Sequence, residues 1–411
     1  MQMGTKYLWL GSYQSSEQFE KMLARNIGQA SGYASQKGII KGLDYYIKGQ
    51  DSLDTIGVVS YPPYPMYPKV KVSREAWSRT GTSRDVTIGY IDIKYITYIF
   101  RNRSLQKEVK NWGRGIDSEN VVVIVYEPSV AKLRAAIYLK RKYKAKIFVI
   151  IPDIPELVNL GANKVIKAGK RYAAKRMQEQ FKMVDGFVLY SECMANYYHL
   201  KDEQWILMEG VYDPDESDIE SVPDDHSTIR LIYCGALDKF RGIPQLLDAF
   251  NELRDKDYEL WFTGAGESDN LIRERALKDD RIHHYGYLDN REEVLKLQKR
   301  ADILIHIRNV ASPAAPYCFP SKIFEYLATG KTVISVRIPG IPEEYFKYMI
   351  PIENLTSDGI RNAIKGAVIK DREERAKLGA EAREFVIDKK NSYVQAKKIL
   401  DFIEKQGELK Q

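Results

Sequence analysis

The sequence has little cysteine, little histidine and no long apolar run. Its three cysteines, Cys193, Cys234 and Cys318, lie far apart without metal-ligand spacing, which is typical of thiols in a reducing cytosol. The five histidines form no His-x-x-x-His or Cys/His cluster, so no metal site is predicted. No segment reaches 18 uninterrupted apolar residues, and the N-terminus lacks a signal-peptide pattern. These absences predict a cytoplasmic protein without a resident metal or cofactor.

Length and composition indicate a globular protein of two domains. A chain of 411 residues is too long for one ordinary hydrophobic core. The net charge of +7 is uneven, with about +14 on residues 1–200 and about −7 on residues 201–411. The basic half is either a solvated surface or a surface that attracts anionic lipid or a diphosphate-bearing acceptor. No nucleic-acid-binding motif accompanies the charge, so no nucleic-acid partner is predicted.

Apolar runs alternate with helical patterns through residues 1–208. Val- and Ile-rich runs separated by helices predict a parallel sheet that is covered on both faces. The predicted strands are Tyr7–Leu10, Ile56–Val59, Val86–Ile91, Val121–Tyr126, Lys146–Ile151 and Gly186–Tyr190, and the clearest helices are Val130–Tyr143 and Lys164–Phe181.

The same rhythm restarts after an acidic segment rich in Ser and Pro. Residues 209–228 lack hydrophobic periodicity, so we interpret them as a linker. The elements predicted beyond it are strands at Arg230–Cys234, Tyr258–Thr263, His283–Tyr285, Ile303–Ile307 and Thr332–Val336, and helices at Pro244–Arg254, Asp269–Leu277, Glu292–Lys299, Lys322–Ala328, Arg372–Val386 and Tyr393–Lys405. We therefore predict two doubly wound α/β domains, residues 1–208 and 229–385, followed by a C-terminal helical segment, residues 386–411.

Glycine turns follow two predicted strands of the second half. Gly235 ends the first strand, and Lys239 and Arg241 precede a helix whose backbone N–H groups would help these cations to bind a diphosphate. Gly264 and Gly266 form a G-x-G after the next strand, where a backbone without side chains allows a ligand to approach. A weaker turn of the same kind ends at Tyr287. The alternative for each turn is an ordinary βα loop.

The most informative stretch is Phe319–Gly330. A strand leads into a proline-containing loop, after which Ser321 is expected to cap a helix that begins at Lys322-Ile323. The helix N-terminus and the Lys322 ammonium group together favour an anion. Glu325 lies one turn further on, where a carboxylate can accept hydrogen bonds from two vicinal ribose hydroxyls. The alternative for Glu325 is a surface carboxylate.

This stretch resembles the donor-site signature of retaining GT-B glycosyltransferases of the family 4 type. The order of the other pieces matches as well: Gly235 to Gly242, then the G-x-G, then Tyr285-Gly286. The resemblance implies two Rossmann-like domains facing across a cleft, with a nucleotide-sugar co-substrate, most simply a UDP-sugar. It places Arg241 on the donor diphosphate and Glu325 on the ribose. It also places Gly11 and Ser12 in an acceptor-side glycine loop, and implies that the last helix crosses back to the first domain.

The chain departs from the family pattern at the donor sugar. The first glutamate of the E-x7-E motif is replaced by Tyr317, and the arginine expected after the first glycine is Ala236. Related members that carry F-P-S-K also lack that first glutamate, so inactivity does not follow. Family members have a histidine or acidic residue after the strand Lys146–Ile151. Asp153 is our catalytic candidate there, a proline-flanked turn residue being the alternative; the reserve candidates are Glu156 and, after an earlier strand, Glu127.

Residues 162–177 combine cations at helical spacing with Val, Ile, Tyr and Met. Such a helix either lies on an anionic membrane or covers a sheet with a solvated basic face.

Together with the resemblance, the sequence predicts a metal-independent glycosyltransferase (a hexosyltransferase). It is expected to use a glycan or lipid-linked glycan acceptor in polysaccharide or glycoconjugate biosynthesis, in the cytoplasm or peripheral to the membrane. The alternatives are a non-catalytic partner of another transferase and a sugar-nucleotide epimerase.

Overall fold

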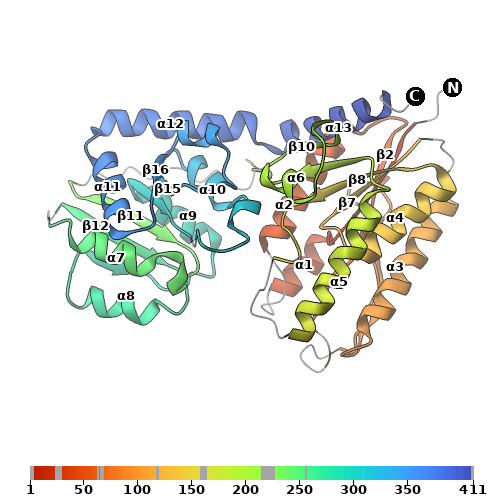
Figure 1. Cartoon of the computed structure of the whole chain (residues 1–411), viewed down its shortest axis with the longest axis horizontal. Helices are drawn as coiled ribbons and strands as arrows, with labels where there is room; N and C mark the ends of the chain where they lie inside the picture. The colour runs from red at the N-terminus through yellow and green to blue at the C-terminus, as the bar shows by residue number, and fades with distance from the viewer. Residues whose placement is uncertain are drawn as a thin grey trace. The chain divides into compact units, whose positions relative to one another are not determined.

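The computed structural model describes residues 4–23, 30–62, 64, 69–116, 120–157, 164–213, 227–254, 257–308 and 310–408. Contacts within the chain define two compact units (Figure 1). The first unit comprises residues 1–211 and 392–411, and the second comprises residues 212–391. Most of the predicted linker, residues 214–226, lies outside the described residues. No described helix is long and apolar enough to cross a membrane.

The first unit is built on an eight-stranded sheet with the order β10-β9-β8-β7-β1-β2-β5-β4. Its strands pair in parallel except for β4 at one edge, which is antiparallel to β5. β7 consists only of buried Val, Ile and Tyr residues, as expected for a strand covered on both faces. The strands are β1 (Lys6–Gly11), β2 (Ser52–Gly57), β4 (Glu75–Trp77), β5 (Asp85–Thr87), β7 (Val121–Tyr126), β8 (Lys146–Ile151), β9 (Gly186–Leu189) and β10 (Trp205–Leu207), with a separate pair β3 (Lys71–Val72) and β6 (Tyr90–Ile91).

Helices cover both faces of this sheet. α3, α4 and α5 form a row in Figure 1, and α2 packs against α13, which returns from the end of the chain. The helices of the first unit are α1 (Ser16–Leu23), α2 (Ala30–Tyr46), α3 (Thr97–Arg114), α4 (Val130–Tyr143), α5 (Lys164–Phe181), α6 (Cys193–Tyr197) and α13 (Ser392–Glu408), with a short 3-10 turn η1 (Asp202–Gln204).

Two glycines let α2 approach α13 closely. A Cβ at Gly42 would lie 2.0 Å from the carbonyl oxygen of Ser392, and a Cβ at Gly38 would lie 3.3 Å from the Ser392 hydroxyl oxygen, at the start of α13. Glycines four residues apart line one face of a helix, so together they form a smooth contact surface. This packing compensates for the low helix propensity of glycine in α2.

The second unit contains a parallel six-stranded sheet with the order β13-β12-β11-β14-β15-β16. In Figure 1, α12 lies above this sheet, and α7 and α8 lie below it. The strands are β11 (Ile229–Cys234), β12 (Tyr258–Thr263), β13 (Ile282–His284), β14 (Ile303–His306), β15 (Thr332–Val336) and β16 (Ile350–Ile352). The helices are α7 (Ile243–Asn251), α8 (Asp269–Ala276), α9 (Arg291–Arg300), α10 (Lys322–Ala328), α11 (Ser357–Val368) and α12 (Arg372–Lys389), with 3-10 turns η3 (Lys239–Arg241), η4 (Ala315–Tyr317) and η5 (Glu343–Lys347).

Candidate functional site

A pocket of about 190 Å³ lies in the second unit, at the carboxyl ends of β11 and β14. From β11 the sheet continues to β12 on one side and to β14 on the other. In an open α/β sheet this arrangement leaves a crevice at the carboxyl ends of the two central strands. Cys234 ends β11, His306 ends β14, and both line the pocket. The other lining residues are Tyr233, Ala236, Arg241, Ile307, Arg308, Pro320, Ser321, Lys322 and Tyr326.

Three cationic side chains, Arg241, Arg308 and Lys322, surround this pocket. Lys322 Nζ donates a hydrogen bond of 2.5 Å to the carbonyl oxygen of Cys234, which directs the ammonium group to the end of β11. Arg241 Nε donates to the carboxylate of Asp238 at 3.1 Å. No carboxylate lines the pocket among the described residues. The lining is therefore suited to an anion.

The pKa of His306 reflects its burial and the positive charge around the pocket. Its ring is buried, and its Nδ1 lies 2.9 Å from the Ser335 hydroxyl. Burial of the ring, together with the nearby charges of Arg308, Lys322 and Arg241, lowers the pKa of His306 to about 3. The three cations thus act on one buried ring, which stays neutral at neutral pH.

Acid should destabilise the fold through His306. The unfolded chain binds a proton near pH 6.5 whereas the folded ring does not, so stability falls as the pH drops below 6.5 towards about 3. Between pH 7 and pH 5, the unfolding free energy of the wild type should fall by about 2 kcal/mol more than that of His306→Asn, because the variant has no such titrating group. Asparagine keeps a polar group near Ser335. Urea unfolding of both proteins at the two pH values measures this difference, and equal losses would contradict it.

The glycine turns pack against each other. A Cβ at Gly264 would lie 1.8 Å from the carbonyl oxygen of Gly235, and one at Gly266 would lie 2.5 Å from the Leu237 backbone. Leu237 N donates to Ala265 O at 2.9 Å, and Ser268 N donates to Leu237 O at 2.7 Å. The absence of side chains at these positions is required for contact between the two loops, which holds the end of β11 in place. The expected contact of these glycines with a ligand stays a prediction.

The predicted residues of α10 have three different environments. Ser321 and Lys322 line the pocket, whereas Ile323 is fully buried in the core. Glu325 is half-buried, and its Oε1 accepts a hydrogen bond of 3.1 Å from Gln298 Nε2. Ser321 has helical backbone angles and makes no capping hydrogen bond, so the predicted cap is wrong.

Lys239 and Tyr287 do not line the pocket. Lys239 Nζ lies 3.7 Å from the Glu267 carboxylate on an exposed surface, and Tyr287 is 70% exposed. Sequence reasoning missed Arg308, which follows β14, because a single arginine in a loop carries no motif. Tyr317, which replaces the family's first glutamate, lies in η4 and is half-buried.

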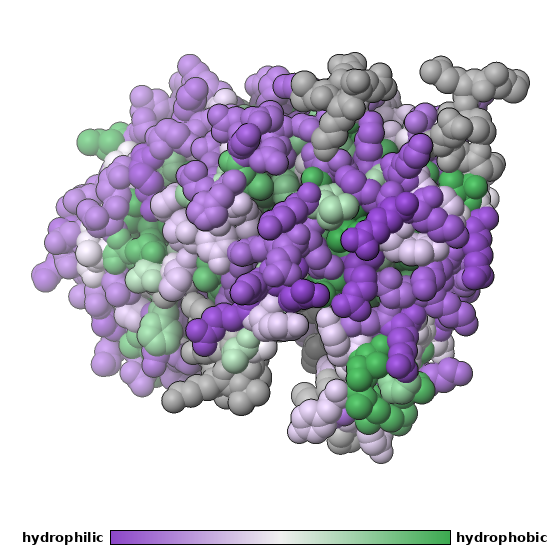
Figure 2. Space-filling model, turned by 45° about the vertical axis from the view of Figure 1, so that its right-hand side comes forward, coloured by the Kyte–Doolittle hydropathy of each residue, from purple (hydrophilic) through white to green (hydrophobic). Residues whose placement is uncertain are grey.

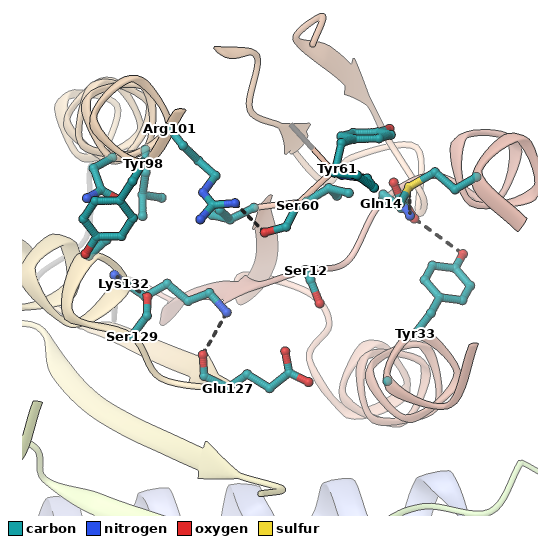
Figure 3. Close-up of a pocket in the computed structure, with 18 of the residues that line it drawn as sticks. Ser12, Gln14, Tyr33, Ser60, Tyr61, Tyr98, Arg101, Glu127, Ser129 and Lys132 are labelled. Carbon is teal, nitrogen blue, oxygen red and sulfur yellow. Dashed lines mark hydrogen bonds between the residues drawn. The ribbon is translucent and has the colours of Figure 1, made fainter. Parts of the chain in front are cut away.

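The first unit has a larger pocket, of about 560 Å³, at the equivalent place in its sheet (Figure 3). Here β1 is flanked by β2 and β7, and the pocket is lined by residues that follow these strands. Among them are Ser12 after β1, Val58 after β2 and Glu127 after β7. Figure 3 shows the Ser12 hydroxyl and the Glu127 carboxylate directed into the same space.

Gln36 packs against Gly11 and holds Ser12 by hydrogen bonds, which explains why these two residues occur together after β1. Its Oε1 accepts hydrogen bonds from Ser12 N at 2.9 Å and from Trp9 Nε1 at 3.2 Å, and its Nε2 donates to Ser12 Oγ at 2.7 Å. A Cβ at Gly11 would lie 2.2 Å from this Oε1. Gly11 therefore leaves room for a fully buried amide that holds Ser12 at the pocket.

Two cations line the first pocket, and sequence reasoning missed both. Lys132 is buried, and its Nζ donates to the carbonyl oxygens of Tyr126 at 2.8 Å and Glu127 at 2.9 Å. Burial lowers the pKa of Lys132 to about 8. Arg101 Nη1 donates to the Ser60 hydroxyl at 2.5 Å. Lys132 resembles an ordinary surface lysine of α4 in the sequence, which is why periodicity gave no sign of it.

Asp153, the predicted catalytic residue, lies outside this pocket. It follows β8 and is exposed, while its neighbour Ile154 is buried. The reserve candidate Glu156 accepts a hydrogen bond of 2.9 Å from the Tyr197 hydroxyl. Glu127, the weakest of the three candidates, is the one that the pocket contains.

Residues 228–367 match the family model described as Glycosyl transferases group 1. The matched segment contains every residue that lines the cationic pocket of the second unit. No curated protein matches the chain in sequence.

Solved structures share the fold over nearly the whole chain. Sucrose-phosphate synthase (tll1590) from Thermosynechococcus elongatus is 14% identical with a TM-score of 0.62, and 98% of each chain is covered. Anabaena Alr3699/HepE in complex with UDP is 12% identical with a TM-score of 0.63, over 98% of this chain and 100% of that chain. A glycosyltransferase from Rickettsia africae ESF-5 is 14% identical with a TM-score of 0.64, over 98% of each chain. These likenesses confirm the predicted α/β fold of the GT-B type.

Proposed function

We propose that this protein is a glycosyltransferase whose second unit binds the donor, a nucleotide sugar of the UDP type. The observation that carries the proposal is that Arg241, Arg308 and Lys322 converge on one pocket. This pocket lies at the carboxyl ends of β11 and β14, the two central strands of the second sheet. That pocket lies within the residues that match Glycosyl transferases group 1. The structures of Anabaena Alr3699/HepE were determined with UDP and with UDP-glucose, which supports UDP as the first nucleotide to test.

The cations have a direct task in this reaction. The bond between the anomeric carbon and the diphosphate oxygen breaks, a bond from that carbon to an acceptor hydroxyl oxygen forms, and the hydroxyl proton leaves with the nucleoside diphosphate. Negative charge grows on the diphosphate as the bond breaks, and fixed cations stabilise that charge more in the transition state than in the substrate. Retention at the anomeric carbon is part of the proposal and comes from the resemblance. Independence of metal is also part of it, because cations and helix N-termini can stabilise the leaving diphosphate.

Glu325 is proposed to accept hydrogen bonds from the ribose hydroxyls. Its support is the hydrogen bond from the buried Gln298, which orients the carboxylate on the helix that also carries Lys322. The pocket of the first unit, with Ser12, Glu127 and Lys132, is proposed to hold the acceptor, a glycan or lipid-linked glycan. Asp153 remains a catalytic candidate from the resemblance alone.

A panel of nucleotide sugars tests the proposal. We expect UDP to bind in calorimetry, and one UDP-hexose to be hydrolysed slowly without acceptor. Conversion to an isomeric nucleotide sugar would instead indicate an epimerase. Binding without any turnover, in the presence of glycan and lipid-linked acceptors, would indicate a non-catalytic partner. Absence of both nucleotide binding and turnover would overturn the proposal.

A further inference from the structure

Six large apolar side chains are exposed within nine residues at the start of α3. Tyr95 is 88% exposed, although large apolar side chains tend to be buried. We call this cluster the apolar tip; its members are Ile91, Ile93, Tyr95, Ile96, Tyr98 and Ile99. Figure 2 shows a hydrophobic patch at the lower right, below a strongly hydrophilic face, at the height where α3 begins in Figure 1. A contiguous patch of this kind marks a contact surface.

The backbone of the apolar tip is held in place from inside. Asp92 is fully buried, its N donates to Val70 O at 2.6 Å, and its Oδ1 accepts from the Thr97 hydroxyl at 2.5 Å. Tyr95 has a φ of +75°, a conformation that is rare for a bulky residue. The hydrogen bonds thus maintain an unfavourable turn that keeps apolar side chains in solvent.

A basic groove runs between α3 and α4 beside the apolar tip. It consists of two adjoining hollows of about 500 and 510 Å³ that share Lys110 and Arg134. No acidic residue lines either hollow among the described residues, and Glu108, the only acidic residue of α3, pairs with Arg74 at 2.9 Å. The cations of the basic groove are Arg103, Lys107, Lys110, Arg114, Arg134, Arg141 and Lys142.

We propose that the first unit docks on an anionic lipid bilayer through the apolar tip and the basic groove. Tyrosine and isoleucine side chains enter the boundary between headgroups and acyl chains, and lysine and arginine side chains attract anionic headgroups. The pairing of projecting apolar side chains with many cations favours a bilayer over a nucleic acid, which offers charge but little apolar depth.

The apolar tip is a different segment from the one for which the sequence suggested membrane contact. Residues 162–177 carried that hypothesis, of which 162 and 163 lie outside the described residues. On α5, Arg171, Lys175 and Arg176 are exposed and Tyr172 is 69% exposed, whereas Met177 is buried. α5 therefore adds charge and an exposed tyrosine to the first unit, and the apolar tip supplies the larger apolar contact.

The docked surface is continuous with the pocket of the first unit. Tyr98 belongs to the apolar tip and lines that pocket (Figure 3). Asn102 lines both the pocket and the basic groove. Arg101, between them, also lines the pocket. An acceptor anchored in the bilayer by its lipid therefore reaches the pocket without leaving the membrane. This last step rests on the proposed function, whereas membrane docking does not.

Vesicle sedimentation of the full chain tests the docking. We expect binding to vesicles of phosphatidylcholine mixed with phosphatidylglycerol, little binding to phosphatidylcholine alone, and weaker binding at high salt. The tip variant Tyr95→Ser/Ile99→Ser and the groove variant Arg103→Gln/Lys107→Gln/Lys110→Gln should each lose binding by at least about tenfold. The matched controls are Leu277→Ser/Ile369→Ser, whose side chains are 88% and 87% exposed, and Lys278→Gln/Lys365→Gln/Lys377→Gln, which removes three exposed charges.

The outcomes separate docking from the proposed function. UDP binding by the tip and groove variants should equal that of the wild type, which also shows that they fold. Equal binding to both kinds of vesicle, or equal losses in the matched controls, would overturn the docking. Binding of a DNA duplex in place of vesicles would likewise overturn it. If vesicles bind as expected but no UDP does, docking stands and the donor proposal fails.

Discussion

Lys322→Met is expected to lower kcat/KM for the nucleotide-sugar donor by about 10²–10³-fold. Lys322 Nζ is anchored 2.5 Å from the carbonyl oxygen of Cys234, at the end of β11. A fixed charge at this place stabilises the diphosphate as it leaves, and removing one such group costs about this factor in other enzymes. Methionine keeps most of the apolar length of lysine, so packing around α10 is preserved. Steady-state donor hydrolysis or transfer, with UDP affinity measured alongside, checks the prediction.

A cation outside the pocket provides the control for Lys322. Arg254→Ala removes an exposed charge from the same unit but from no pocket lining, and its kcat/KM should stay within about twofold of the wild type. Arg308→Ala should fall between the two, because Arg308 lines the pocket without a backbone anchor of this kind. Equal activity of Lys322→Met and the wild type would show that the leaving diphosphate lies elsewhere.

Gly264→Ala is expected to lower the free energy of unfolding by about 3–5 kcal/mol. The new Cβ would lie 1.8 Å from the carbonyl oxygen of Gly235, and both partners are backbone that a side-chain rotation cannot move. The φ of +143° at Gly264 also disfavours any residue with a Cβ. Urea unfolding of the full chain, followed by circular dichroism, measures the loss.

Two other glycines separate the causes of this effect. Gly286 has a φ of +71° but nothing within 4 Å of an added Cβ, so Gly286→Ala should cost only about 1 kcal/mol of backbone strain. Gly366 lies within α11 with open space around it, and Gly366→Ala should stabilise the chain by about 0.5–1 kcal/mol. Similar losses in Gly264→Ala and Gly286→Ala would mean that the two loops can separate at little cost.

Elements with a strong local pattern were predicted closely. The bounds of β7, β8, β12 and β15 agree with the prediction, as do those of α4 and α10. Continuous runs of Val, Ile and Phe indicate strands that are covered on both faces, because such runs are short for a helix and rich in β-branched and aromatic residues. These signals depend only on neighbouring residues, so one sequence contains them fully.

Elements that depend on distant contacts were missed or misplaced. α2 was not predicted because its glycines favour loops, and the close packing of α13 on Gly42 is a contact across about 350 residues of sequence. The predicted strand Val86–Ile91 is two strands in the structure, β5 and β6, which belong to different sheets. A Cβ at Gly89, between them, would lie 2.4 Å from Arg74 N, so another segment occupies the space beside the break.

By itself the sequence determined the α/β class, most strands of both sheets and the pocket residues Arg241, Ser321 and Lys322. These follow from local periodicity and from a motif within one segment. Only the tertiary structure decided that Arg308 and His306 join them, that Glu127 rather than Asp153 lines the first pocket, and that the apolar tip is exposed. The physical reason is that burial and convergence are properties of positions brought together by folding. A cation has the same local sequence signal whether it faces a pocket or the solvent.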